Sequence, residues 1–491
     1  MNNNFSGEIS QFYNEKCVFI TGATGFMGKV LVHKLLNSCP GLENLYVLIR
    51  PKRDVLPQIR LDKVFEGPLF KGLKEVNPSC FNKVIAINGD ITLPSLGMSR
   101  EDLTTIIEKV SVIFHAAATV RFDEELRKSL IMNVGGTRSI IDIAQKMLNL
   151  KALVHVSTAY AHCNNPSTIE EKFYRNHDSP DDIIEKISST EELDEKALIG
   201  EYPNTYTFTK AVAEQLFDKA HGLPVAIIRP SIVVASWEYP MKGWIDNYNG
   251  PTGLLAGAST GVLRTMLVKR DCVADLIPVD VAINVMIVSA WKIAQEHNTR
   301  PVIYNVTSGS INPITWGQIE DWTLVSIKKF PMSTMLWYPG GSFKKNAHYD
   351  LICRWLFLYT PAFLIDVVST ILRMPRWATK LSGRIMKQIE VLQFFTLNEW
   401  SWSNHNLNNL QKTLVSTDKN SLKTFDFNIR PLDWRIFLDH YVLGTRHFVF
   451  KDHPDTMNSS RKKLKFLYFL HFIVQLSFIF FVVYNLMASI Y

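Results

Sequence analysis

The chain lacks the features of several protein classes. Its six cysteines all lie more than four residues apart, so there is no CxxC pattern and no zinc spacing, and we expect reduced thiols and no metal site. Residues 1–10 are polar without an apolar core, so we expect no secretory signal there. The 53 Lys and Arg against 46 Asp and Glu give a net charge of +7, too small over 491 residues to indicate nucleic-acid binding. With 47% hydrophobic and 20% charged residues, the chain is globular rather than disordered.

One long uncharged run stands at the end of the chain. Residues 466–490 contain no Asp, Glu, Lys or Arg, and four basic residues directly precede them: Arg461, Lys462, Lys463 and Lys465. At about 1.5 Å per residue, a helix of this length can span a bilayer core of about 30 Å. The positive-inside rule places the upstream chain in the cytosol. We therefore expect a single-pass C-terminal anchor in the endoplasmic reticulum or the peroxisome, with a buried hydrophobic helix as the alternative.

Upstream, short apolar runs alternate with helical patterns. The runs predict strands at residues 17–20, 45–49, 84–87, 112–115, 153–156 and 225–228, and the patterns between them predict helices at 29–36, 134–147 and 206–220. This alternation predicts an α/β fold with a doubly wound parallel sheet, as in Rossmann domains. Residues 169–201, rich in Asp and Glu, interrupt the pattern, and we expect an exposed, partly helical insertion there.

The turn after the first strand has the glycine spacing of a dinucleotide fingerprint. Gly22 permits a tight turn, Gly25 lets backbone approach a pyrophosphate, and Gly28 lets the following helix pack on the sheet. The N-terminus of that helix then faces the phosphate charge. The segment predicted to bind the cofactor comprises Thr21, Gly22, Thr24, Gly25, Phe26, Met27 and Gly28.

The end of the second strand indicates which dinucleotide binds. NAD-specific sites usually carry a carboxylate there for the ribose 2′-hydroxyl, but this strand ends in Arg50-Pro51, followed by Lys52 and Arg53. Arg50 is placed to meet a 2′-phosphate, so the sequence favours NADP(H). A solvated basic turn is the alternative.

Three further strand ends supply candidate cofactor contacts. Asp90 and Ile91 follow the third strand, where an adenine edge would lie, and Asp90 is a candidate acceptor for the adenine amino group. Small residues at Ala116 and Ala117, after the fourth strand, would let a cofactor cross the sheet, although packing alone could explain them. Backbone groups near Pro230 and Ile232, after the sixth strand, could hold the nicotinamide carboxamide.

A tyrosine and a lysine provide the candidate reaction chemistry. At spacing four on a helix, Tyr206 and Lys210 share one face. We expect the ammonium to lower the pKa of the phenol, which can then pass a proton to a developing alkoxide, and Lys210 could also bind the nicotinamide ribose. A hydroxyl to bond the substrate oxygen should come from Thr158 or Ser157, of which strand alternation presents only one; we favour Thr158.

After about residue 310 the strand–helix alternation stops, and residues 345–445 are mostly helical in pattern. Residues 351–372 are strongly apolar but contain Arg354, Pro361 and Asp366, so a bilayer span is not expected. A helix pair at the membrane surface or over an acyl pocket fits this segment, as does ordinary core. Residues 243–261, with five glycines, are expected to form a loop lining a pocket.

Together these motifs resemble the extended short-chain dehydrogenase/reductases and, more narrowly, the eukaryotic fatty acyl-CoA reductases, including insect members. The likeness rests on residues 18–31, 48–51, 115–122, 133–137 and 156–160, and past residue 310 on Asp426-Phe427-Asn428, Asp433-Trp434 and Gly444-Thr445-Arg446, which are similar to that family's sterile domain. The resemblance implies a Rossmann catalytic domain at 12–310, a helical C-terminal domain at 345–452 and a transmembrane helix at 466–490.

The resemblance also implies the reaction. Long-chain fatty acyl-CoA would be reduced by two NADPH-dependent hydride transfers, first to an enzyme-bound aldehyde and then to a primary alcohol, with release of CoA. Both steps need a proton donor and hydrogen bonds at one oxygen, which Tyr206 and Thr158 could supply. Two alternatives stay open: a membrane-bound NADP-dependent hydroxysteroid-type dehydrogenase, and a cofactor-binding scaffold without turnover.

Overall fold

The computed structural model describes residues 7–51, 55–175, 178–189, 194–296 and 300–489. The chain forms two compact units, each assembled from three segments. Unit 1 comprises Met1–Met241, Asp275–Pro313 and Trp400–Leu432, and unit 2 comprises Lys242–Ala274, Ile314–Glu399 and Asp433–Tyr491. The chain therefore leaves and re-enters unit 1 twice.

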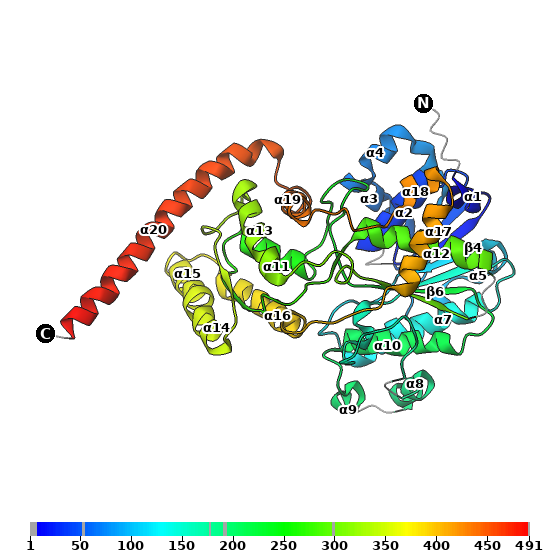
Figure 1. The fold of residues 1–491 in the computed structure, drawn as a ribbon, viewed down its shortest axis with the longest axis horizontal. Coiled ribbons are helices and arrows are strands. Elements are labelled where there is room, and N and C mark those ends of the chain that lie inside the picture. The colour runs from blue at the N-terminus through cyan, green and yellow to red at the C-terminus, as the bar shows by residue number, and fades with distance from the viewer. Residues whose placement is uncertain (1–6, 52–54, 176–177, 190–193, 297–299, 490–491) are drawn as a thin grey trace. The chain divides into compact units, whose positions relative to one another are not determined.

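Unit 1 is built on a seven-stranded sheet in which all neighbouring strands are parallel (Figure 1). The strand order is β10-β6-β5-β4-β1-β2-β3, so the winding direction reverses between β1 and β4. In an open α/β sheet, ligands bind outside the carboxyl ends of the strands at this reversal. The strands are β1 (Cys17–Thr21), β2 (Asn44–Ile49), β3 (Val84–Asn88), β4 (Val110–His115), β5 (Ala152–Val156), β6 (Val225–Pro230) and β10 (Val302–Val306).

Helices cover both faces of this sheet. Helix α12 contacts α2 and lies against β5 and β6. Helices α7 and α10 contact each other and belong to the other helical layer. A buried apolar cluster joins α7 and α10 to the sheet. The helices of unit 1 are α1 (Glu8–Phe12), α2 (Phe26–Ser38), α3 (Pro57–Phe65), α4 (Pro68–Val76), α5 (Arg100–Lys109), α6 (Leu126–Leu130), α7 (Gly136–Ala144), α8 (Pro180–Ser189), α9 (Glu195–Ile199), α10 (Thr205–Asp218), α12 (Val279–Glu296), α17 (His405–Ser416) and α18 (Lys419–Phe425).

The predicted parallel sheet and all six predicted strands are confirmed, with small differences at their ends. The seventh strand, β10, was not predicted; it pairs with β6 at the sheet edge. Two short strands of unit 1, β7 (Ile232–Val234) and β9 (Leu276–Pro278), also pair in parallel. The predicted insertion at 169–201 contains α8 and α9 as expected, but it is not simply exposed, because Ile169 and Ile183 are fully buried.

Unit 2 is mostly helical, with one parallel pair of short strands, β8 (Thr265–Leu267) and β11 (Ser342–Lys344). Residues 243–261 were expected to form a loop, but they include helix α11 (Pro251–Ser259). The remaining helices are α13 (Trp316–Lys329), α14 (Ala347–Arg354), a π-helical turn (Trp355–Tyr359), α15 (Thr360–Ile371), α16 (Ala378–Leu397), α19 (Trp434–Gly444) and α20 (Met457–Ala488).

The C-terminal helix α20 has the length and composition to cross a membrane. It contains 32 residues, about 48 Å at 1.5 Å per residue. Residues Pro454–Ala488 have a mean hydropathy of 2.3 in their most apolar window, of which only 6% is buried. A second segment, Ala347–Ile371, is also long and apolar enough to cross a membrane, with a mean hydropathy of 1.7 in its most apolar window, of which 28% is buried. The long exposed apolar helix at the C-terminus indicates that the protein associates with a membrane.

Candidate active site

The glycine-rich turn follows β1 at the point where the sheet reverses direction. Gly22 has φ +79°, and a Cβ there would lie 2.7 Å from the backbone N of Ala117. A Cβ on Gly28 would lie 2.1 Å from the carbonyl oxygen of Gly22, so helix α2 could not pack against the turn. The backbone N–H of Gly25 donates to that same oxygen at 2.9 Å. Glycine is therefore required here both by backbone conformation and by close packing.

Helix α2 begins directly after this turn. Its N-cap is Gly25, which makes no side-chain capping bond, and its first turn has no acidic side chain. The first N–H groups of a helix lack intrahelical partners and carry a partial positive charge, so they favour an anion. Thr24, Phe26 and Met27 are partly exposed beside it. This turn and helix start have the geometry that a pyrophosphate cradle requires, and their binding of a cofactor stays a prediction.

Arg50 and Asp90 lie together at the ends of β2 and β3. Arg50 Nη1 is 3.8 Å from Asp90 Oδ2, and the Arg50 side chain is 59% exposed. Arg60 adds a third charged group, because its guanidinium donates to the carbonyl oxygen of Arg50. Arg50 therefore presents an accessible guanidinium at the predicted 2′-phosphate position; Lys52 and Arg53 lie outside the described residues.

The Asp90 carboxylate is already engaged within its own turn. Its Oδ1 accepts the backbone N–H of Thr92 at 3.0 Å and the Thr92 hydroxyl at 2.9 Å. The adjacent Ile91 is buried. A Cβ added to Gly136 would lie 3.2 Å from the Cβ of Ile91. Ile91 thus packs against the start of α7, and the role of either residue toward adenine stays a prediction.

Ala116 and Ala117 follow directly after β4, across the reversal from the glycine turn. Ala117 N donates to Thr21 Oγ1 at 3.2 Å, and Ala116 N donates to the Thr21 carbonyl oxygen at 3.2 Å. Thr21 Oγ1 also bonds His115 Nδ1 at 2.7 Å. Burial, with the nearby charge of Lys210, lowers the pKa of His115 to about 3, so this imidazole is neutral and serves the packing of the strand ends.

The two candidate hydroxyls after β5 have different surroundings. The Ser157 hydroxyl donates to the carboxylate of Glu214, and Ser157 is buried. Thr158 Oγ1 instead accepts from Tyr160 N at 3.2 Å and lies 3.5 Å from the carbonyl oxygen of Pro230. The Thr158 hydroxyl is also near enough to Tyr206 to lower the pKa of that phenol. The structure therefore brings Thr158, rather than Ser157, to the phenol.

Tyr206 stands on the first turn of α10, where the Asn204 side chain caps the helix by accepting from Thr207 N at 2.9 Å. Its ring stacks on Phe122 with centroids 5.5 Å apart. Burial raises the pKa of Tyr206 to about 12, and the nearby Thr158 hydroxyl opposes this. The expected lowering by Lys210 is not found: the pKa lies above its usual value, Lys210 is not among its causes, and the phenol holds its proton at neutral pH.

Lys210 lies one turn later and points to the end of β5. Its Nζ donates to the carbonyl oxygen of Val156 at 2.7 Å. Burial lowers the pKa of Lys210 to about 8, and the Glu214 carboxylate partly opposes this. The ammonium is therefore charged near neutral pH and loses its proton as the pH rises through about 8.

A buried ionic cluster behind these residues was missed from the sequence. Glu214 Oε2 accepts from Arg229 Nη2 at 2.6 Å and lies 3.0 Å from His162 Nε2, while the Ser157 hydroxyl donates to Oε1. Burial opposes ionisation, yet the Arg229 guanidinium and the His162 bond hold the pKa of Glu214 well below its usual value. Glu214 is four residues after Lys210, a helical spacing that could have signalled a shared face.

Asn133 was also not singled out as a site residue. Its side chain accepts from Thr119 N at 2.9 Å and donates to Thr209 Oγ1 at 2.9 Å. It lies in a π-helical turn, Ile131–Gly135, and such turns are frequent at functional sites. Asn133 therefore ties the loop after β4 to helix α10.

The remaining predicted cofactor contacts lie past β6. Pro230 ends that strand, and its carbonyl oxygen faces the Thr158 hydroxyl. Ile232 begins β7, and its N–H donates to the Asp275 carbonyl oxygen at 3.2 Å. The carboxyl ends of β1, β4, β5 and β6 thus meet along one edge of the sheet, with the glycine turn at one end and Tyr206 at the other.

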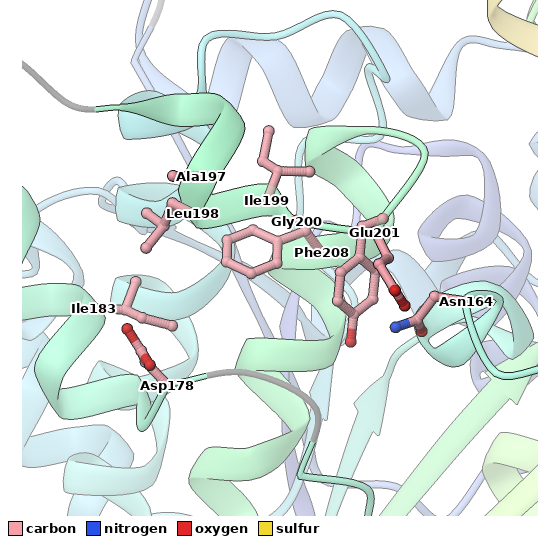
Figure 2. A pocket seen from close by; sticks show the side chains of 10 residues that line it. Asn164, Asp178, Ile183, Ala197, Leu198, Ile199, Gly200, Glu201 and Phe208 are labelled. Atoms are coloured by element: carbon pink, nitrogen blue, oxygen red, sulfur yellow. The ribbon is translucent and has the colours of Figure 1, made fainter.

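A separate cavity of about 270 Å³ lies between the insertion and α10 (Figure 2). Phe208 contributes to it, but two helical positions place Phe208 about 200° around the helix from Tyr206, so the cavity opens on another side of α10. None of the predicted catalytic side chains lines it. Its lining is Asn164, Asp178, Ile183, Ala197, Leu198, Ile199, Gly200, Glu201, Tyr202 and Phe208.

The described residues fit a nicotinamide dinucleotide. The cradle at Gly22 and Gly28 would be filled by any Cβ, and the uncapped start of α2 suits a pyrophosphate. Among the described residues no group of three or more potential metal ligands is found.

Comparisons with known proteins agree with this geometry. An NAD-binding family model described as "Male sterility protein" matches residues 20–286, and a second, "Sterile" model with the same description matches residues 357–452. Fatty acyl-CoA reductase 1 of Homo sapiens is 41% identical over 467 residues, covering 93% of this chain and 89% of the human protein. Fatty acyl-CoA reductase wat of Drosophila melanogaster is 38% identical over 475 residues, with 94% and 90% covered.

Solved structures support the fold. The terminal R domain of the myxalamid PKS-NRPS pathway superposes with a TM-score of 0.59 at 18% identity, covering 89% of this chain and 92% of that one. The reductase domain of a nonribosomal peptide synthetase from Mycobacterium tuberculosis gives 0.59 at 21% identity, with 88% and 92% covered. From the matched models and the full-length relatives, this chain belongs to the fatty acyl-CoA reductase family.

Proposed function

We propose that this enzyme, an alcohol-forming fatty acyl-CoA reductase, uses NADPH to reduce long-chain acyl-CoA to the primary alcohol. In the first reduction the acyl carbon accepts a hydride, its carbonyl oxygen gains a proton, and the C–S bond then breaks to give aldehyde and CoA. In the second, the aldehyde carbon accepts a hydride and its oxygen a proton. Each reduction consumes one NADPH, which supplies the hydride. The observation that carries the proposal is the position of Lys210, one turn after Tyr206 on α10. Its Nζ donates to the carbonyl oxygen of Val156 at 2.7 Å and so holds this face of the helix at the end of β5, just before Thr158.

Tyr206 is the proton donor in this proposal. With a pKa of about 12 it holds its proton at neutral pH, as an acid must before the oxygen becomes basic. Thr158, near the same phenol, is placed to donate to that oxygen and to stabilise its developing negative charge. Ser157 serves the buried cluster at Glu214 instead.

Lys210 binds the nicotinamide ribose and favours charge on the phenol during proton transfer. Its bond to the Val156 carbonyl oxygen fixes the ammonium at the end of β5, next to Ser157 and Thr158. Pro230 and Ile232 line the carboxamide end, and Thr21, Ala116 and Ala117 provide the crossing over the sheet. These assignments follow the strand ends on which the residues stand.

NADPH is proposed over NADH on the basis of Arg50. Its guanidinium is 59% exposed at the end of β2, where a 2′-phosphate would lie, and a guanidinium matches phosphate geometry better than a ribose hydroxyl. Asp90, 3.8 Å away, orients it. In this proposal Asp90 accepts the adenine amino group and at the same time keeps its hydrogen bonds to Thr92.

The domain assignment is part of the proposal. Residues 12–310 would bind cofactor and carry the reaction, residues 345–452 would form the sterile-type domain, and residues 466–490 would span the membrane. The basic residues before the helix would keep the catalytic part in the cytosol, at the endoplasmic reticulum or the peroxisome. Acyl-CoA and fatty alcohol are both amphiphilic, so a membrane location suits substrate and product.

A product assay tests the proposal. Detergent-solubilised protein is incubated with NADPH and a mixture of saturated and unsaturated acyl-CoAs, and products are identified by gas chromatography. We expect primary alcohol, with turnover at least about 100-fold lower in Tyr206→Phe at nearly unchanged NADPH affinity. The matched control is Tyr160→Phe, a tyrosine packed between Trp400 and Trp402. Alcohol formation that survives Tyr206→Phe would remove the phenol from the mechanism, and absence of alcohol from the wild type would refute the proposed reaction.

A further inference from the structure

Helices α14 and α15 and the π turn between them form a segment with an unusual distribution of polarity. Between Leu351 and Leu372 every formally charged side chain faces the protein, and the outward face is mainly apolar, with Thr360 and Thr370 as exposed polar residues. The large apolar side chains that are at least 39% exposed are Leu351, Ile352, Trp355, Leu356, Phe357, Phe363, Leu364, Ile365, Val367, Val368, Ile371 and Leu372. We name these twelve side chains the apolar face. On a helix at a water-facing surface, the charged and polar side chains face the solvent and the apolar side chains face the protein.

The inward side of the same segment explains where its charges go. Asp350 is buried and lies 2.5 Å from Arg354 Nε, and it also accepts the Thr265 hydroxyl at 2.6 Å. Asp366 accepts the N–H groups of Trp377, Ala378 and Thr379, each at 3.0 Å. It thereby caps the start of α16. The charges that argued against a bilayer span are satisfied inside unit 2 and do not interrupt the apolar face.

Exposed cations follow directly after the apolar face. Between residues 373 and 389 the exposed charged side chains are all basic, namely Arg373, Arg376, Lys380, Arg384 and Lys387, and the first acidic residue is Glu390. Trp377, 42% exposed, lies among them. Cations and tryptophan beside an apolar surface are the composition found where proteins meet anionic headgroups.

The segment cannot simply cross the bilayer. Residues before and after it belong to the same unit 1: Asn305 Nδ2 donates to the Ser403 carbonyl oxygen at 2.9 Å, and Trp402 pairs with Ile169. In unit 2, Lys269 N donates to the Thr396 carbonyl oxygen at 3.0 Å. A single crossing by residues 347–371 would separate these partners across the membrane.

We propose that the apolar face lies in the interfacial layer of a membrane with anionic headgroups, as a second contact besides α20 that does not span. Its apolar side chains enter the acyl boundary, and the exposed cations from Arg373 to Lys387 bind the headgroups. The proposal does not depend on the catalytic assignments. It orients unit 2 on the membrane surface, which a single spanning helix with a short linker would not do.

Photo-crosslinking of the full chain tests this contact. A benzophenone amino acid replaces Phe363 in the apolar face, Phe480 in α20 as a positive control, or Val325 in α13, 65% exposed, as a matched negative control. Each protein is placed in vesicles of phosphatidylcholine with about 20 mol% phosphatidylserine, illuminated, and analysed for lipid adducts by mass spectrometry. Reductase activity before illumination reports folding.

We expect lipid adducts at position 363 at least about tenfold above those at 325 and comparable with those at 480. Adducts at the level of 325 would overturn the proposal. A covalent product of twice the chain mass in place of lipid adducts would also overturn it, because the apolar face would then bind a second copy. In the variant Lys380→Gln/Arg384→Gln/Lys387→Gln, we expect adducts at 363 to fall at least about threefold in anionic vesicles but not in pure phosphatidylcholine. If the variant gave the same adduct yield in anionic vesicles as in pure phosphatidylcholine, relative to the parent protein, the role of anionic headgroups would be refuted.

Discussion

Replacing Glu214 by glutamine should impair both folding and the pH range of catalysis. Glu214 and Arg229 are almost completely excluded from solvent and are joined at 2.6 Å. Removing one partner of a buried ion pair leaves the other charge uncompensated, which costs about 3–5 kcal/mol. The lost acceptor for Ser157 and His162 adds to this. Glu214→Gln should therefore lower the free energy of unfolding by at least about 3 kcal/mol.

The effect on catalysis acts through Lys210. The Glu214 carboxylate raises the pKa of Lys210 against the larger effect of burial, which brings it to about 8. Charges at helical spacing four, about 6 Å apart, interact by about 3 kcal/mol at an effective dielectric constant of about 20, and Arg229 offsets part of this. In the Glu214→Gln variant no carboxylate offsets the Arg229 guanidinium, so the pKa of Lys210 falls. The alkaline limb of the pH–activity profile should therefore move to lower pH by at least about one pH unit.

The assay is kcat/KM for acyl-CoA against pH, with the urea midpoint measured in the same detergent. The control Glu214→Gln/Arg229→Met removes both charges, so stability should largely return and the limb should lie between those of wild type and Glu214→Gln. A folded Glu214→Gln enzyme with an unchanged alkaline limb would refute the electrostatic link to Lys210. A loss of stability below about 1 kcal/mol would refute the ion-pair argument.

Three further outcomes test the site and the anchor. Thr158→Val should lower kcat about 100-fold because the hydrogen bond to the reacting oxygen is lost, whereas Ser157→Ala should cost less than about tenfold; the reverse order in steady-state kinetics would exchange their roles. Arg50→Glu should raise KM for NADPH at least about tenfold while NADH changes little, and an unchanged preference would place the phosphate site elsewhere. Deleting residues 466–491 should release the protein from carbonate-washed membranes, and retention in the pellet would identify a further integral anchor.

The parts of this fold that sequence reasoning predicts are those with local causes. Gly22 and Gly28 are required by a turn and a packing contact within seven residues, so the spacing alone indicates the cradle. Buried parallel strands are continuous apolar runs, which is why six strands were predicted. β10 escaped notice because Tyr304 and Asn305 interrupt its apolar run, although both are buried.

The buried ionic cluster has no such local cause. Glu214 stands on α10, Arg229 on β6, and Ser157 and His162 in the segment after β5, so only the fold brings them within hydrogen-bond distance. For the same reason Lys210 was expected to act on Tyr206 directly, whereas its ammonium bonds the end of β5. Charged residues on an amphipathic helix are normally exposed, so nothing in the pattern of α10 distinguishes Glu214 from a surface side chain.

The apolar segment at 351–372 shows a different limit of sequence reasoning. Arg354 and Asp366 argue against a bilayer span, but the sequence alone does not show on which side of the helices each charge lies. Their effect depends on direction: both charges are satisfied on the inward side, by Asp350 and by the start of α16, and the outward side is left apolar. A helix that packs its charges against its own protein can meet lipid along its opposite face. The same two residues that exclude a spanning helix are therefore what allows this segment to remain attached to unit 2 while its other face contacts a membrane.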